Sequence, residues 1–128
     1  GSNGYITFDV ADTNYLPSEE SHLQKKRISV FFADVDPSDG GEVQFADLNT
    51  AVAITWKNVT IDDPSHHDQE HISPQQTTFQ TILFEDGTIW MGFQEVQTNS
   101  SSIIGLSSGS QGLAPVEAVR SLASIQEC

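Results

Sequence analysis

The chain has 128 residues, and its eighteen Asp and Glu residues against five Lys and Arg give a formal net charge of −13 at pH 7. This length suits one domain with its own hydrophobic core. A negative field repels phosphate groups, which argues against nucleic acid as a partner. No apolar run approaches the roughly 20 residues that a membrane helix needs, so we expect no membrane insertion. The single cysteine, Cys128, cannot form an internal disulfide.

In chain order, most of the expected elements are short strands. β-Branched and aromatic runs predict them in five stretches, at residues 4–8, 28–33, 42–45, 50–59 and 103–106. The connection from 9 to 27 has room for a helical turn near residues 18–23. We expect the strand at 42–45 to pair back across the acidic turn at 34–41. Residues 60–76 are polar and aperiodic, which predicts a long exposed hairpin loop.

The clearest local signal is a hairpin over residues 79–93. Two apolar runs flank Glu85-Asp86-Gly87-Thr88. Asp-Gly is typical of a type I′ turn, in which both central residues take positive φ. The sequence therefore predicts two antiparallel strands joined at Asp86 and Gly87.

Short strands separated by turn signals predict an all-β fold, an antiparallel β-sandwich over residues 1–112. Residues 113–128 are expected to be a C-terminal linker or tail, and a short helix and an extended segment both fit their spacing. An odd number of strands and an abrupt first strand suggest a sandwich that is incomplete at its N-terminal edge.

Five stretches in this order carry a resemblance to a known family. They are residues 2–8, 32–43, 54–59, 78–89 and 104–106. Together they resemble the nidogen-type (NIDO) extracellular domain and the related module of plexin-domain-containing proteins, from the first strand to about residue 112. The resemblance implies a non-catalytic extracellular module of an adhesion, matrix or secreted multidomain protein. It carries no shared ligand site, so it assigns no binding residue.

An acidic turn supplies a calcium candidate. Asp34, Asp36 and Asp39 precede Gly40 and Gly41, and carboxylates that converge on a turn can coordinate Ca²⁺. The alternative, which we favour, is an Asx-type turn in which Asp side chains accept backbone N–H groups and Gly supplies positive φ. We expect no required cofactor, with calcium as the one candidate.

A second metal candidate lies in the polar loop. His66, His67 and His71 offer imidazole ligands for Zn²⁺ or Cu²⁺. Pro64 and Pro74 argue against the helix that would place His67 and His71 on one face. A solvated loop is the favoured interpretation.

Two sequence patterns mark modification sites. Asn58-Val59-Thr60 and Asn99-Ser100-Ser101 match the N-glycosylation acceptor pattern. Both fall at strand ends or turns, where a glycan would project.

Aromatic side chains give a ligand-stacking candidate. Trp90 and Phe93 could offer a platform for a sugar, whereas Trp56 lies in an alternating run that favours the core.

No catalytic arrangement stands out, and we predict that the chain is not an enzyme. The expected function is a non-catalytic, extracellular or cell-surface module that serves adhesion or structural assembly through protein–protein contacts, in part by strand addition. The alternative is a calcium- or carbohydrate-binding accessory module of a secreted enzyme.

Overall fold

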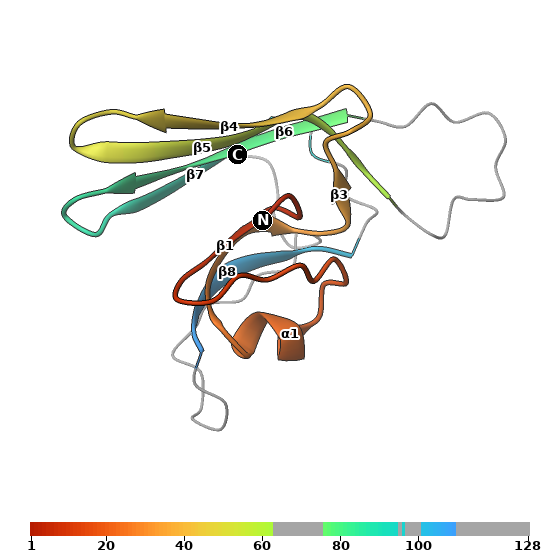
Figure 1. Ribbon diagram of the computed structural model, residues 1–128, viewed down its shortest axis with the longest axis horizontal. Helices are drawn as coiled ribbons and strands as arrows, with labels where there is room; N and C mark the ends of the chain where they lie inside the picture. The colour runs from red at the N-terminus through yellow and green to blue at the C-terminus, as the bar shows by residue number, and fades with distance from the viewer. Residues whose placement is uncertain (63–75, 95, 97–100, 110–128) are drawn as a thin grey trace, which may run out of the picture. The chain divides into compact units, whose positions relative to one another are not determined.

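The computed structural model describes residues 1–62, 76–94, 96 and 101–109 (Figure 1). Within these residues the elements follow the order β1 (Tyr5–Thr7), α1 (Glu19–Leu23), β2 (Lys26–Phe32), β3 (Val35–Asp36), β4 (Glu42–Asp47), β5 (Ala51–Ile61), β6 (Gln76–Phe84), β7 (Ile89–Gln94) and β8 (Ile103–Ser108). All pairings are antiparallel. The predicted all-β class is confirmed, and the two antiparallel sheets are the components that a sandwich requires. Residues 113–128, where we expect a helix or tail, lie outside the described part.

The described residues form two compact units, each with one sheet. The first unit holds the sheet β1-β2-β8 and the helix α1. Its central strand β2 is buried from Arg27 onward. The expected helical turn is confirmed as α1, where Ser18 and Ser21 form a reciprocal capping box. Within the described residues, no helix is long and apolar enough to cross a membrane.

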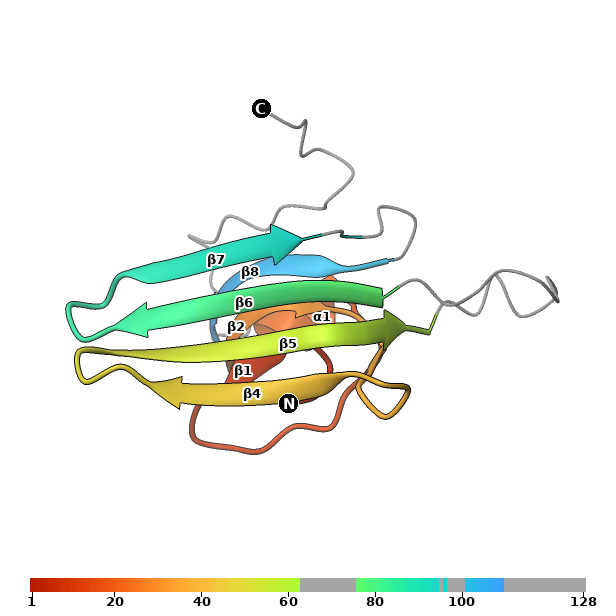
Figure 2. The same cartoon turned by 90° about the horizontal axis from the view of Figure 1, so that it is seen from above.

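The second unit holds a five-stranded sheet built around β5, which pairs with β6 along one side and with β4 and β3 along the other. Figure 2 shows β4, β5, β6 and β7 side by side. Trp56 of β5 is fully buried, as its alternating run predicts. The partner predicted for the strand at 42–45 is wrong. β4 pairs with the following strand, β5, through the turn at residues 48–50, where Asn49 supplies a positive φ of 68°.

The predicted hairpin at 79–93 is confirmed as β6 and β7, but its turn is of another kind. Gly87 has a φ of 87°, and Asp86 is not in the positive-φ region. The N–H of Gly87 donates to the carbonyl of Phe84, whose own N–H donates to the carbonyl of Thr88. This is a three-residue loop closed by a glycine bulge, which needs only one residue at positive φ.

Candidate functional site

The acidic turn does not gather its carboxylates into a metal site. Among the described residues there is no cluster of three or more His, Cys, Asp or Glu side chains that could hold a metal ion. Oδ1 of Asp36 instead accepts the backbone N–H of Ser38 at 2.7 Å. Hydrogen bonds from the side chain and then the backbone of Ser38 lower the pKa of Asp36 below its ordinary value. Asp36 thus makes the Asx-type contact favoured from the sequence, while Asp34 and Asp39 belong to no such cluster.

The other sequence-predicted sites divide between described and undescribed residues. His66, His67, His71 and Asn99 lie outside the described residues. Asn58 is exposed, has a φ of 51° and sits at a register shift in β5 between Trp56 and Val59. The structure therefore places one glycosylation candidate on an accessible bulge.

The two stacking candidates do not share a surface. Trp90 lies opposite Ile82, and Phe93 lies opposite Phe79. Side chains alternate between the faces of a strand, so residues three apart point in opposite directions. Trp90 and Phe93 are 48% and 38% exposed, but they lie on different faces of the five-stranded sheet and cannot form one platform.

Trp90 is folded along its own strand. A Cβ atom built at Gly92 would lie 2.2 Å from Cη2 of the Trp90 indole and within 2.9 Å of two further ring atoms. The ring thus occupies the space in which a side chain at residue 92 would lie. Glycine inside a strand commonly marks such a close approach. Here the absence of a side chain at Gly92 lets the indole pack against the backbone of the sheet.

A transverse row of residues runs across this face of the sheet. Gln44, Thr55, Gln80 and Gly92 are successive register partners on β4, β5, β6 and β7. The amide Nε2 of Gln80 donates to Oγ1 of Thr55 at 2.6 Å. The next row, from β4 to β7, is apolar and ends at Trp90; its members are Ala46, Ala53, Ile82 and Trp90. Trp90 thus stands where a polar row meets an apolar one, and we call this surface the Trp90 face.

β7 is the last strand of its sheet in the described part of the chain, and it pairs only with β6. Its sequence, Ile-Trp-Met-Gly-Phe-Gln, contains no charge and no proline. Edge strands in monomeric proteins usually carry such residues because an open edge is a template for another strand. β7 therefore has the composition of a strand that accepts a partner.

The ladder also fixes which backbone groups of β7 face outward. The N–H of Phe84 bonds to the carbonyl of Thr88, so these two residues form a hydrogen-bonded pair. Such pairs alternate with non-bonded ones along an antiparallel ladder. Trp90 and Gly92 consequently direct their backbone groups to β6. The backbone groups of Ile89, Met91 and Phe93 point to the open edge.

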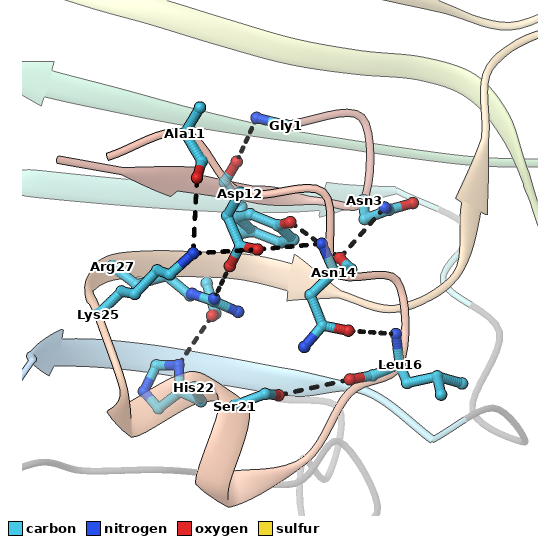
Figure 3. A network of polar contacts seen from close by, with 12 residues as sticks. Gly1, Asn3, Ala11, Asp12, Asn14, Leu16, Ser21, His22, Lys25 and Arg27 are labelled. Carbon is cyan, nitrogen blue, oxygen red and sulfur yellow. Dashed lines mark hydrogen bonds and ion pairs between the residues drawn. The ribbon is translucent and has the colours of Figure 1, made fainter. Parts of the chain in front are cut away.

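The first unit contains a polar network that the sequence did not reveal (Figure 3). Arg27 is 2% exposed, and its guanidinium carbon lies 4.3 Å and 4.7 Å from the ring centroids of Tyr5 and Phe32. Its Nη2 pairs with the carboxylate of Asp12, which Lys25 also contacts at 3.3 Å. Two rings and a carboxylate enclose the cation, so Arg27 holds the loop of Asp12 against β2 and is not placed to meet a ligand.

A buried histidine adjoins this network. His22 of α1 is fully buried, and its Nδ1 lies 2.9 Å from Oγ of Ser29 on β2. This contact ties the short helix to the central strand. The His22 side chain therefore has a structural role. Nothing in the polar sequence around His22 predicted that it would be buried.

Comparisons with protein-family models, with curated proteins and with solved structures find no match to this chain.

Proposed function

We propose that the chain is a non-catalytic module that joins other protein chains by accepting an extended segment at the open edge of β7. The observation that carries this proposal is the uncharged, regular strand Ile89–Gln94 at the end of the five-stranded sheet. Strand addition uses backbone hydrogen bonds for affinity and alternating side-chain pockets for specificity. This assigns the expected role in adhesion or assembly to one strand.

The other edges of the described sheets are less suited to this role. β4 begins with Glu42 and ends with Asp47. β1 and β3 are only three and two residues long. The pairing of β8 with β2 is interrupted by a register shift between Ser29 and Phe32. Short, charged or irregular strands are the usual means of closing an edge to partners.

The charge of the chain indicates the chemistry of the partner. A net charge of −13 opposes the approach of another acidic chain, including a second copy. Glu85 and Asp86, in the turn that precedes β7, add two acids at one end of the edge. The expected partner is an extended segment with apolar side chains at alternate positions and with neutral or basic residues between them.

The setting we propose for this function is extracellular or at the cell surface, in a larger secreted or surface protein. The acidic composition and the resemblance to the nidogen-type domain support this setting. The exposed Asn58 acceptor pattern is compatible with it.

A peptide-display selection tests the edge directly. The intact chain is used to select binders from a random peptide library, and each binder is titrated against the wild type, Met91→Pro and Met91→Ala. Proline removes an outward N–H without breaking the ladder to β6, whereas alanine removes only the side chain. We expect Met91→Pro to weaken binding about tenfold or more and Met91→Ala to retain most of it.

Hydrogen exchange provides the second readout. A bound peptide should protect the amides of Ile89, Met91 and Phe93, which face the open edge. Binders with equal affinity for the wild type and for Met91→Pro would contradict the proposal, as would amide protection confined to strands other than β7. A selection that yields no binder would also count against it.

A further inference from the structure

The Trp90 face has the components of a ligand site that does not depend on strand addition. The proposed function uses backbone groups at the edge of β7, whereas this face presents side chains perpendicular to the sheet. Three of its features bear on a ligand: the position of the indole, the fixed amide beside it and the charge of the surroundings.

The indole is held at the sheet surface and remains half exposed. Its ring fills the side-chain space of Gly92, and 48% of Trp90 is accessible. On the same face, Phe84 is 40% exposed and lies one row beyond Ile82, the register partner of Trp90. Isolated apolar side chains on a surface are ordinary. Here three apolar residues, Trp90, Ile82 and Phe84, occupy neighbouring positions on one face of the sheet.

A fixed amide adjoins these apolar residues. Gln80 is the register partner of Gly92, so its side chain emerges next to the indole. Its Nε2 donates to Oγ1 of Thr55 at 2.6 Å, and this hydrogen bond fixes the orientation of the amide. An amide retains a carbonyl acceptor and a second N–H, and a threonine hydroxyl retains its proton. Donors and an acceptor therefore stand directly beside an aromatic surface.

This combination matches one class of ligand. A pyranose ring presents a face of C–H groups, which packs on an aromatic ring, and a rim of hydroxyl groups, which pair with amides and hydroxyls. Adjacent strands of a sheet lie about 4.8 Å apart, so a short oligomer laid across β7, β6 and β5 meets Trp90, Gln80 and Thr55 in turn. The net charge of −13 disfavours anionic ligands. We propose that Trp90, Gln80 and Thr55 form a binding site for a neutral oligosaccharide.

Affinity electrophoresis of the intact chain tests this site. The gels contain one of five neutral polysaccharides: hydroxyethylcellulose, laminarin, galactomannan, arabinoxylan or glycol chitin. Trp90→Ala removes the stacking surface, and Gln80→Ala removes the amide. Phe93→Ala is the matched control, because it deletes an aromatic ring of similar exposure from the opposite face of the same strand. Thermal melts of each variant establish that it is folded.

The wild type is expected to be retarded by at least one polysaccharide. Trp90→Ala should abolish the retardation, Gln80→Ala should weaken binding about tenfold, and Phe93→Ala should leave it unchanged. No retardation in any gel, equal retardation of Trp90→Ala, or equal loss in Phe93→Ala would overturn the proposal.

A measurement without substitutions guards against a variant that fails to fold. The chain has two tryptophans, and Trp56 is fully buried. Quenching of the fluorescence by acrylamide therefore reports mainly on Trp90. A short oligosaccharide of the polysaccharide that retards the chain should reduce this quenching. Unchanged quenching at a saturating concentration would contradict stacking on Trp90.

Discussion

Trp56 and Phe79 face each other directly across β5 and β6, with ring centroids 5.0 Å apart and ring planes inclined by 16°. Both side chains are buried, so this stacked pair contributes two large rings to the apolar core. Phe79→Ala should lower the free energy of unfolding by about 3–5 kcal/mol, the usual cost of deleting a buried aromatic ring.

Phe93→Ala is the matched control, because Phe93 is the register partner of Phe79 on β7 and is partly exposed. Its cost should be about 1 kcal/mol. Urea unfolding of both variants measures the difference. A larger loss for Phe93→Ala than for Phe79→Ala would show that the stacked pair does not dominate the packing.

The pair of Arg27 and Asp12 predicts how stability responds to acid. Burial acts to raise the pKa of Asp12, but hydrogen bonds from Asn14 and Lys25 and the charge of Arg27 outweigh it and hold the pKa below its ordinary value. A carboxylate with a lowered pKa in the folded state contributes stability above its unfolded pKa, about 3.9, and that stability is lost as the pH falls further. The melting temperature should therefore fall below about pH 4.

Asp12→Asn should remove this part of the acid dependence and should destabilise the chain near neutral pH, because it leaves the buried Arg27 without a counter-charge. Asp9→Asn is the control, since Asp9 pairs with Lys26 in an exposed bridge of little value. Thermal melts from pH 2 to pH 7 compare the two variants. If both variants show the same acid dependence, the role of Asp12 is disproved.

Two glycines should respond differently to alanine. A Cβ at Gly41 would lie 2.7 Å from the backbone carbonyl oxygen of Asn58, whereas a Cβ at Gly87 would meet nothing within 4 Å. Gly41→Ala forces the backbone at residue 41 away from Asn58, and it should lower the free energy of unfolding by about 2 kcal/mol or more. Gly87→Ala should lower the free energy of unfolding by only about 1 kcal/mol, because its sole cost is a side chain at the left-handed φ of 87°. Chemical denaturation should give this order, and the reverse order would contradict it.

Calcium should not stabilise the chain through its acidic turn. Asp36 already accepts a hydrogen bond from Ser38, and the described residues contain no three-carboxylate cluster. An ion that binds the folded state must raise the melting temperature. We expect equal melting temperatures in EDTA and in millimolar Ca²⁺. If Ca²⁺ raises the melting temperature and Asp36→Asn abolishes this rise, the acidic turn is a calcium site after all.

Features fixed by neighbouring residues could be predicted from the sequence. The hairpin of β6 and β7 follows from two apolar runs around Asp86-Gly87, and the helical turn follows from Ser18 and the acids after it. The sequence also suffices to predict that the side chains of Trp90 and Phe93 point in opposite directions, because the two residues are three apart in one strand.

Features that depend on distant segments could not be predicted. Arg27 falls at the end of segment 9–27, which the sequence predicts to be a connection between strands. It lies instead at the start of β2, buried because Asp12 approaches from a loop 15 residues away. β4 was given the wrong partner because Asp47-Leu48-Asn49 lacks the glycine that usually signals a hairpin turn. The contact of Gln80 with Thr55 depends on the register of two strands joined by a polar segment.

The position of β5 sets an order in which the second unit comes apart. β5 is bordered by β6 on one side and by β4 and β3 on the other, so its amides open only when a neighbouring strand leaves. Among the described residues β7 pairs only with β6, so it can peel away alone. In native-state hydrogen exchange, β5 should mark the slowest, globally unfolding group of amides and β7 a faster, local one. A pulling force applied through residue 94 would then unzip β7 one residue at a time, while the strands around β5 break together.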